Sequence, residues 1–302
     1  MPAIIMDGRA VRAMLLPELR RNVEEIKEKY GRVPCLAAIL VGDDPASRQY
    51  VKNKQRTTEE LGCESRTIRL SAAEGTTPTL LKVIAGLNAD PSVNAILLQL
   101  PVPDGVDQFA LFDAIDPLKD LDAVGSSSVG GFYRGRWGRF IPCTPRGVLT
   151  LLDYYKVPVG GARAVVIGRS DIAGKPMAVI LGGRMCNATV TWCHRKTRDL
   201  PAVCREADIL IPCVGAEIPG GGPYFITADM VKPGACVIDV GFRRIGPGKF
   251  AGDVDFEAVK EVAGWITLNP GGTGPMTVVA LMQNLLDATR YQLGLDRLKY
   301  SI

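Results

Sequence analysis

A tyrosine and a lysine four residues apart, Tyr50 and Lys54, are the first residues whose types and spacing suggest chemistry. Residues at positions i and i+4 of a helix share one face, so the phenol and the ammonium group would point to the same side. Together they offer a hydrogen-bonding group and a proton donor to a substrate. The spacing alone does not make the pair catalytic, because most such pairs lie on ordinary protein surfaces.

A second chemical signal lies in the later half of the chain, where the apolar run 163–167 leads into glycines at 168 and 174. A glycine turn between a strand and a helix lets backbone N–H groups approach a pyrophosphate at the helix N-terminus. The spacing is G-x5-G rather than G-x-G-x-x-G, so the local pattern also fits a turn that binds nothing.

The end of the next predicted strand indicates which dinucleotide this turn would bind. Sites for NAD usually carry an acid there, which binds the ribose 2′-hydroxyl. Here residues 194–198 read HRKTR, with three cations and no acid. Arg195 and Arg169 could neutralise a 2′-phosphate, so the pattern favours NADP, with a solvated basic loop as the alternative.

The composition excludes several other classes of function. The chain has 302 residues, of which 47% are hydrophobic and 23% charged, so it is long enough for two folded domains and is not disordered. The net charge of +4 is a weak excess spread along the chain, unlike the clustered basic face of a nucleic-acid-binding protein. A single histidine, His194, argues against a His-rich zinc site and a Ser-His-Asp triad.

The eight cysteines have no C-x-x-C spacing, so we expect buried, reduced thiols and no metal site. No apolar run approaches the roughly 18 residues of a membrane span, and the first twenty residues lack an uninterrupted apolar core. We therefore expect a cytoplasmic protein that binds neither membranes nor nucleic acid.

Apolar runs alternate with helical patterns in both halves of the chain, which is typical of parallel βαβ units. The sequence predicts strands at 34–41, 65–70, 95–99, 163–167, 188–193, 209–214, 236–240 and 265–268. It predicts helices at 9–29, 47–61, 78–88, 107–115, 175–184 and 276–293, and a further helix starting at 144. The glycine-rich stretch 125–139 is expected to be an irregular connection between two domains.

Short motifs follow one another along most of the chain, at 41–47 (VGDDPAS), 50–54 (YVKNK), 99–103 (QLPVP), 168–170 (GRS), 252–254 (GDV) and 269–277 (NPGGTGPMT). In this order they resemble the signatures of the bifunctional methylenetetrahydrofolate dehydrogenase/methenyltetrahydrofolate cyclohydrolase family. The resemblance runs from about residue 3 to residue 290. It implies an α/β fold with an N-terminal folate-binding catalytic domain (1–140) and a Rossmann-like NADP-binding domain (141–274). Residues 275–302 would return to the first domain as a helix.

The resemblance also implies the reactions and a homodimer. The reactions are NADP-dependent oxidation of 5,10-methylenetetrahydrofolate to the methenyl form and hydrolysis of that product to 10-formyltetrahydrofolate. Lys54 matches the family's catalytic lysine, suited to proton transfer during ring opening, and Gln99 matches the residue that orients it. Tyr50 matches the aromatic residue that packs along the folate. Asp122 matches the carboxylate that receives the pterin N–H groups.

Other positions match the family's binding residues. For the folate these are Pro101, Gly272 and Pro275, in addition to Tyr50, Gln99 and Asp122. For NADP they are Gly168, Arg169, Ser170, Arg195 and Phe242. Hydride transfer needs positioning rather than a side-chain acid, which fits a site without histidine.

Several positions depart from the family's usual pattern, among them Asn269, Thr273 and Phe242 and two longer segments. Ser128 stands where an asparagine is usual, and a hydroxyl offers fewer hydrogen bonds than an amide. The loop at 216–224 is longer and richer in Gly and Pro, and we expect it to border the nicotinamide. One alternative is therefore a dehydrogenase with weak or absent cyclohydrolase activity. Others are a non-catalytic NADP-binding protein and a shikimate-type dehydrogenase.

Overall fold

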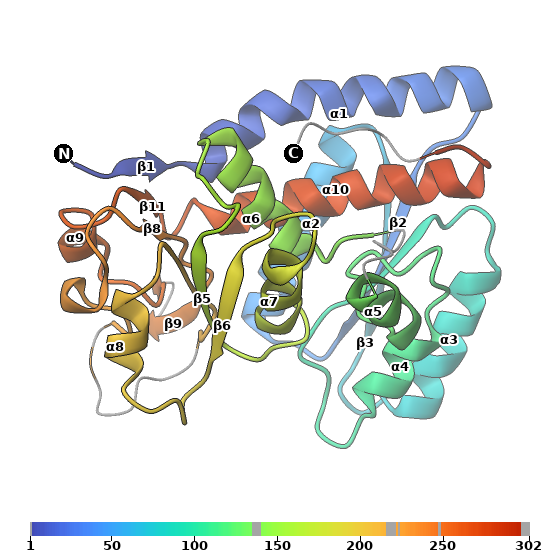
Figure 1. The fold of residues 1–302 in the computed structure, drawn as a ribbon. Helices are drawn as coiled ribbons and strands as arrows, with labels where there is room; N and C mark the ends of the chain where they lie inside the picture. The colour runs from blue at the N-terminus through green and yellow to red at the C-terminus, as the bar shows by residue number, and fades with distance from the viewer. Residues whose placement is uncertain (1, 135–139, 216–221, 223, 247–248, 297–302) are drawn as a thin grey trace. The chain divides into compact units, whose positions relative to one another are not determined.

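The computed structural model describes residues 2–134, 140–215, 222, 224–246 and 249–296 (Figure 1). The chain divides into two compact units. We call the unit that joins Met14–Cys143 to the described residues 278–296 the first-half unit. The second-half unit joins the residues up to Ala13 to Thr144–Thr277. These bounds differ from the predicted domains mainly at residues 2–13, and the functional assignment of the domains stays a prediction.

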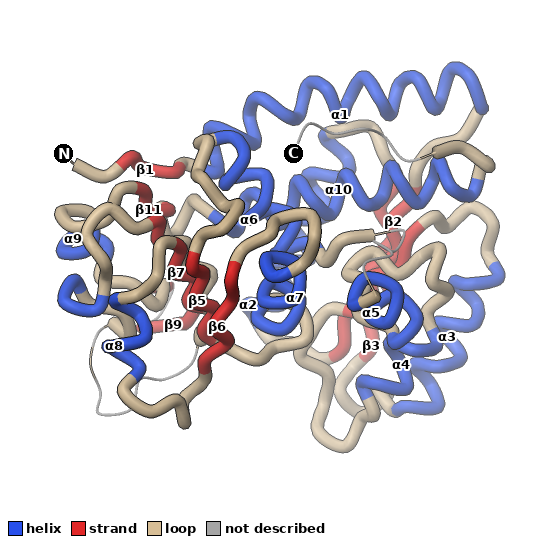
Figure 2. Tube along the Cα trace, in the orientation of Figure 1, coloured by secondary structure: helices blue, strands red, loops and turns tan. Residues whose placement is uncertain are grey.

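The first-half unit is built on a three-stranded parallel sheet, in the order β3 (Glu64–Leu70), β2 (Cys35–Val41), β4 (Ala95–Leu98). All seven residues of β2 are buried, because a central parallel strand is covered on both faces. Helices α2 (Pro45–Glu60), α3 (Thr77–Ala89), α4 (Gln108–Ala114) and α5 (Ser126–Tyr133) complete the unit, and α3 and α4 lie side by side (Figure 2).

The second-half unit contains a six-stranded parallel sheet. Its strand order is β1 (Ile4–Met6), β11 (Trp265–Thr267), β8 (Cys236–Val237), β7 (Ile209–Pro212), β5 (Arg163–Ile167), β6 (Thr189–Cys193). Strands β5 and β7 are neighbours although β6 lies between them in the sequence, as in a doubly wound fold.

Shorter elements and four helices accompany this sheet. They are α6 (Cys143–Tyr154), α7 (Gly174–Gly182), α8 (Leu200–Arg205), α9 (Phe256–Val259), the 3₁₀ helix η1 (Ala228–Met230), and an antiparallel hairpin of β9 (Arg243–Gly246) and β10 (Lys249–Ala251). The predicted α/β class with two units is confirmed. The hairpin, β1 and the short helices α8 and α9 were not predicted.

Two long helices, α1 (Gly8–Tyr30) and α10 (Thr273–Gln292), begin in the second-half unit and continue in the first-half unit. Within the first-half unit, the side-chain nitrogen of Asn284, on α10, donates to the carbonyls of Leu121 (2.7 Å) and Ile141 (2.9 Å). The side chains of Gln292 and Asn94 also bond to each other at 2.8 Å. The prediction that the last helix returns to the first part of the chain is confirmed.

The prediction of an irregular connection at 125–139 is wrong for its first part, which forms α5. Two carboxylates outside the segment start this helix. Asp120 accepts a hydrogen bond from the Gly125 N–H (3.0 Å), and Asp113 accepts one from the Ser126 N–H (2.7 Å). Phe132 is buried and anchors the other end. Residues 135–139 lie outside the described residues.

Within the described ranges, no helix is both long and apolar enough to span a bilayer.

We predict that Asn284→Ala lowers the free energy of unfolding by about 2–4 kcal/mol, because two buried carbonyls lose their donor. Urea unfolding followed by circular dichroism measures this change. As a control, Gly86→Ala lies on an exposed face of α3 where a Cβ meets no atom within 4 Å. That change should instead stabilise the protein by about 0.5–1 kcal/mol. Equal urea midpoints for Asn284→Ala and the parent would contradict the prediction.

Candidate active site

Helix α2 presents the first group of predicted site residues. Its start is fixed by Asp44, whose side chain accepts a hydrogen bond from the Ser47 N–H (2.7 Å), and by Pro45 in the first turn. The Ser47 hydroxyl in turn donates to the Leu100 carbonyl (3.3 Å). The helix start is therefore tied to the segment after β4, and Tyr50 and Lys54 follow on the next turns.

Lys54 and Gln99 are brought together. The Lys54 Nζ donates to the Gln99 Oε1 at 3.2 Å, and the Gln99 Nε2 donates to the Leu100 carbonyl at 2.8 Å. The second bond orients the amide so that its oxygen faces the lysine. Pro101 comes next along the chain, is exposed, and follows a cis peptide bond.

Tyr50 lies one turn before Lys54 and is 38% exposed. Burial of its hydroxyl raises the pKa of the phenol to about 12. The phenol is therefore neutral at physiological pH and keeps its O–H as a hydrogen-bond donor. An aromatic ring that is partly exposed beside a lysine can pack against a flat ligand.

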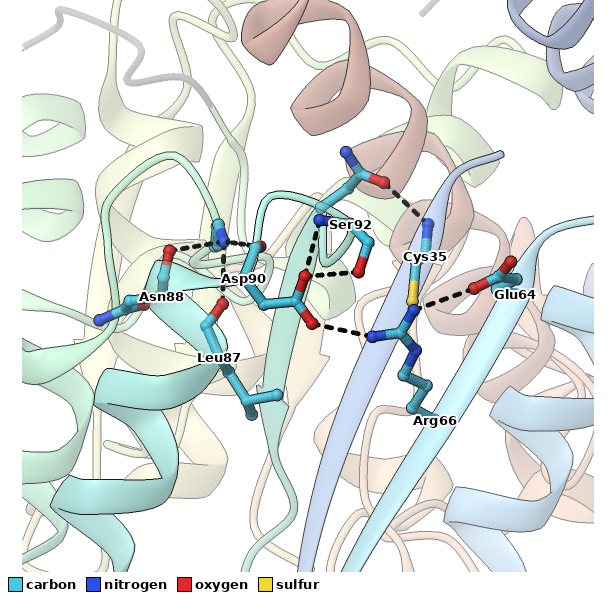
Figure 3. A network of polar contacts seen from close by, with 9 residues as sticks. Cys35, Glu64, Arg66, Leu87, Asn88, Asp90 and Ser92 are labelled. Atoms are coloured by element: carbon cyan, nitrogen blue, oxygen red, sulfur yellow. Dashed lines mark hydrogen bonds and ion pairs between the residues drawn. The ribbon is translucent and has the colours of Figure 1, made fainter. Parts of the chain in front are cut away.

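The segment leading to Asp122 is held by a buried lysine that the sequence reasoning missed. Lys119 is 6% exposed, and its Nζ donates to the carbonyls of Leu87, Asn88 and Asp90 at 2.8–2.9 Å. Figure 3 labels these three carbonyl-bearing residues. These carbonyls lie at the end of α3, where a helix leaves carbonyls without internal partners. Burial lowers the pKa of the Lys119 ammonium group.

Figure 3 also shows how the start of the sheet is joined to this helix end. Arg66 on β3 contacts Asp90 (2.9 Å) and Glu64 (3.3 Å), and Asp90 also accepts hydrogen bonds from Ser92. The Cys35 N–H at the start of β2 donates to the Asn94 side chain at 2.9 Å. These contacts are structural, because they lie at the amino ends of the strands.

Asp120 holds the same segment from the other side. It is buried, and its carboxylate accepts hydrogen bonds from the N–H groups of Val124 (3.2 Å) and Gly125 (3.0 Å) and from the Ser128 hydroxyl (2.7 Å). Burial raises the pKa of Asp120. Ser128, expected to weaken hydrogen bonding, thus makes a short bond to a buried acid. No sequence pattern distinguished Asp120 from its neighbours.

Asp122 is half-buried, and no hydrogen bond to its carboxylate is formed within the described ranges. The Leu121 carbonyl before it accepts from Asn284 (2.7 Å). Three successive residues, 119–121, are therefore each fixed by hydrogen bonds, and the next one offers a carboxylate to a ligand. Such preorganisation lowers the entropic cost of binding.

The predicted dinucleotide turn joins β5 to α7. Gly168 has φ +133°, and a Cβ there would lie 2.5 Å from the Cys213 carbonyl oxygen. A Cβ on Gly174 would clash with the carbonyl of Gly168 and approach the Arg169 nitrogen to 3.0 Å. Both positions therefore require glycine. Because glycine has no side chain, the backbone at these two positions is not covered by a Cβ. The residues present fit a pyrophosphate-binding turn.

Exposed polar groups surround this turn. Arg169 and Ser170 follow β5, Arg195 follows β6, and all three are exposed at the carboxyl ends of neighbouring strands. The Ser170 hydroxyl accepts from the Gly174 N–H (3.3 Å). A further group that was not predicted is Trp192, 45% exposed, whose indole N–H donates to the Gly168 carbonyl at 2.6 Å.

The remaining predicted residues lie elsewhere in the second-half unit. Phe242 is 38% exposed and stacks on Phe250, with ring centroids 4.6 Å apart. Gly272 is buried, and a Cβ there would lie 2.5 Å from the Leu268 carbonyl oxygen. Pro275 belongs to the first turn of α10. The loop at 216–224 lies outside the described residues except for 222 and 224.

His194, the single histidine, has a structural contact. Its Nδ1 accepts from the Lys196 N–H at 3.1 Å, within the turn after β6. All eight cysteines are free thiols. Across the described part of the chain, no cluster of three or more His, Cys, Asp or Glu residues could hold a metal ion.

Comparison with known families shows which family the chain belongs to. Residues 6–122 match the model of the tetrahydrofolate dehydrogenase/cyclohydrolase catalytic domain, and residues 142–293 match the NAD(P)-binding domain of the same family. The chain belongs to this family. The predicted family is therefore confirmed.

Individual relatives agree with this assignment over nearly the whole chain. The bifunctional protein FolD of Moorella thermoacetica is 48% identical over 290 residues, covering 96% of this chain and all of that protein. The bifunctional enzyme FolD of Campylobacter jejuni, a methylenetetrahydrofolate dehydrogenase/cyclohydrolase, has a crystal structure with TM-score 0.89 and 41% identity, covering 96% and 99% of the two chains.

A further relative has been solved with its cofactor. The FolD structure from Trypanosoma brucei, described as complexed with NADP cofactor and inhibitor, has TM-score 0.90 and 33% identity and covers 97% of this chain and 99% of that one.

We predict that Gly174→Ala weakens dinucleotide binding by about tenfold or more, because the new methyl group must displace the backbone of the turn. Titration with the dinucleotide, followed by tryptophan fluorescence, measures the dissociation constant. Gly182→Ala, at the last residue of the same helix, is the matched control. Its Cβ would meet only Val190, at an ordinary 3.5 Å. Unchanged binding by Gly174→Ala would contradict the assignment of this turn.

Proposed function

We propose that the protein oxidises 5,10-methylenetetrahydrofolate with NADP and hydrolyses the methenyl product to 10-formyltetrahydrofolate. The observation that carries the proposal is the Lys54–Gln99 hydrogen bond of 3.2 Å, in a chain that matches both domains of the family. This bond joins the Lys54 amino group, which would transfer protons, to the Gln99 amide, which orients that amino group. The relatives named bifunctional support both activities in one chain.

The residues proposed to hold NADP are Gly168, Arg169, Ser170, Arg195 and Phe242. The bare backbone between Gly168 and Gly174 accommodates the pyrophosphate, and the two arginines neutralise the 2′-phosphate. A bound NADP supplies the hydride acceptor for the oxidation. The protein contributes orientation to this step, because hydride transfer from the methylene carbon needs no proton from a side chain.

Lys54 is proposed to move the proton in the hydrolysis. Water adds to the cationic methenyl carbon and loses a proton, which leaves a hydroxyl on that carbon. The bond from the carbon to N5 then breaks as N5 gains a proton, and the hydroxyl loses its remaining proton to become the formyl C=O, so the overall reaction releases one proton. An amine held by the Gln99 oxygen can accept the first proton and donate the second. The hydrogen bond keeps Nζ in one place through both transfers.

Tyr50, Asp122, Pro101, Gly272 and Pro275 are proposed to bind the folate. The Tyr50 ring packs along the substrate, and its neutral phenol adds a hydrogen-bond donor. The Asp122 carboxylate, which the described residues leave unpaired, accepts two pterin N–H groups.

The bifunctional enzyme is favoured over a dehydrogenase without cyclohydrolase activity. The reason for considering the second possibility was the altered segment at 123–130. Ser128 in that segment contacts Asp120 rather than Lys54. The hydrogen bond between Lys54 and Gln99 does not involve that segment.

We also propose a homodimer in the cytoplasm. Strand β3 lies at the edge of its sheet, so its outer backbone groups are available to a second copy of the chain. The free thiols of all eight cysteines are typical of a reducing compartment.

The parent enzyme should reduce NADP in the presence of methylenetetrahydrofolate without accumulating the methenyl compound. We predict that Lys54→Met slows the hydrolysis by about 10²–10⁴-fold, the usual contribution of a general acid–base group, while hydride transfer partly survives. The methenyl compound then accumulates and is seen by its absorbance.

Lys52→Met is the matched control, because Lys52 is exposed on the same helix. It should behave like the parent. Equal loss of both reactions in Lys54→Met would contradict this division of roles. A parent that turns over no methylenetetrahydrofolate would refute the proposed function itself.

We predict that Arg195→Ala raises the KM for NADP by about 10–100-fold, as expected for the loss of a charge-assisted hydrogen bond, and changes the KM for NAD much less. Steady-state kinetics with both cofactors give the ratio. Arg198→Ala removes an exposed charge from the same loop and should leave the ratio unchanged. If Arg195→Ala also leaves the ratio of the KM values for NADP and NAD unchanged, Arg195 does not bind the 2′-phosphate and is only a solvated surface charge.

A further inference from the structure

Two buried aspartates close the base of the β9–β10 hairpin, and neither has a role in the mechanism above. Asp239 is 2% exposed, and its Oδ1 accepts hydrogen bonds from the N–H groups of Gly241 (2.9 Å) and Asp253 (3.0 Å). Gly241 precedes the hairpin and Asp253 follows it. One carboxylate oxygen therefore joins both ends of the hairpin, and its partner Oδ2 accepts from the Val254 N–H (3.2 Å).

Asp253 extends this set of contacts to the end of β7. Its side chain is fully buried, with Oδ2 accepting from the Val214 N–H (2.7 Å) and Oδ1 from the Gly215 N–H (3.0 Å). Val214 and Gly215 come directly after β7 and the single residue Cys213. The pair Asp239–Asp253 thus connects the carboxyl ends of β7 and β8 through main-chain N–H groups.

The packing around the pair leaves no room for other side chains. A Cβ on Gly241 would clash with the Asp253 carboxylate, and one on Gly252 would clash with the Asp239 carboxylate. Gly215 has φ +56°, and a Cβ there would lie 3.2 Å from the Phe242 carbonyl oxygen. The two carboxylates therefore bind the residue before Phe242, Gly241, and the residue packed against its carbonyl, Gly215.

Burying two acids together costs free energy, because charge is removed from water and like charges repel. This cost is reflected in the raised pKa values of both carboxyl groups. Burial raises the pKa of Asp239 to about 7 and also raises that of Asp253, while the Arg243 guanidinium lowers the latter. Burial, and then the charges of Asp253 and Asp239, raise the pKa of the Cys213 thiol. Perturbed acids of this kind gather at functional sites more often than elsewhere.

The place of the pair in the sheet indicates which part of the cofactor it serves. Dinucleotides bind outside the carboxyl ends of the strands of a doubly wound sheet, one half on each side of the switch point. Arg169 and Arg195 follow β5 and β6, and they are the proposed partners of the adenosine 2′-phosphate. In the strand order β8-β7-β5-β6 the ends of β7 and β8 lie on the opposite side, toward the nicotinamide half.

We propose that Asp239 and Asp253 are positioning residues for hydride transfer, which hold Gly215 and Phe242 against the nicotinamide half of NADP. This inference rests on the proposed function. It assigns to the pair an effect on the dehydrogenase alone, because the hydrolysis needs no cofactor.

The test compares Asp253→Asn and Asp239→Asn with Asp255→Asn. The control removes the same charge from the same segment, but Asp255 only caps the short helix α9, accepting from the Ala258 N–H. In the first two variants the KM for NADP should rise by about tenfold or more, since a buried acceptor is weakened. Hydrolysis of methenyltetrahydrofolate, assayed without NADP, should stay within about twofold of the parent. The control should match the parent in both assays.

The parent enzyme provides a second measurement that does not depend on a variant folding. As pH falls from 8 to 6, protonation of the pair weakens its hold on the N–H groups, so the KM should rise for NADP and for NAD alike. In Asp239→Asn this pH dependence should be lost. NAD is included because the 2′-phosphate of NADP titrates as well.

Three results would overturn the inference while leaving the proposed function intact. These are an unchanged KM for NADP in Asp253→Asn and Asp239→Asn, an equal loss of both activities, or a pH dependence confined to NADP. A parent enzyme without dehydrogenase activity would instead refute the proposed function.

Discussion

Buried charged side chains that bind main-chain groups are the interactions on which both units depend. Lys119 binds three carbonyls at the end of α3, and Asp120 binds two N–H groups and a hydroxyl. Asp239 and Asp253 bind five main-chain N–H groups between them. A charge removed from water must be fully hydrogen-bonded, so each of these side chains fixes the backbone around it. Loops that would otherwise be mobile are held in one conformation.

Two of the residues proposed to touch ligands, Asp122 and Phe242, are neighbours of these buried charges. Asp122 follows Lys119 and Asp120 closely in the chain, and Phe242 follows Asp239. A ligand-binding group works best when it is held rigidly yet left unsatisfied, because binding then costs little conformational entropy. In this structure, rigidity is provided by one set of residues and ligand binding is proposed for another. The buried acids and Lys119 are satisfied mainly by main-chain groups, whereas Asp122 is half-buried and its carboxylate accepts no hydrogen bond from the described residues.

The sequence predicted the strands well where a continuous apolar run is long, as in 35–41 and 163–167, because buried parallel strands are apolar on both faces. It failed for α5, whose start depends on acids 6 and 13 residues earlier in the chain. Local patterns do not contain such distant hydrogen bonds. For the same reason Lys119, Asp239 and Asp253 looked like ordinary charged residues, although the motif around 252–254 had drawn attention to one of them. The motifs located Lys54 and Gln99, and the family resemblance implied that Gln99 orients the lysine; the structure gives the atoms of that contact and its length of 3.2 Å.

The altered segment at 123–130 illustrates how a change within a motif can leave the chemistry intact. The Ser128 hydroxyl needs to supply one donor to Asp120, and a hydroxyl does this at 2.7 Å. The other donors to that carboxylate are the backbone N–H groups of residues 124 and 125, which every residue type except proline supplies. Lys54 and Gln99 belong to α2 and the end of β4, and their contact is formed independently of α5. A substitution that weakened the Lys54–Gln99 contact itself would therefore have to act on α2 or on the end of β4, where the sequence keeps the family's motifs.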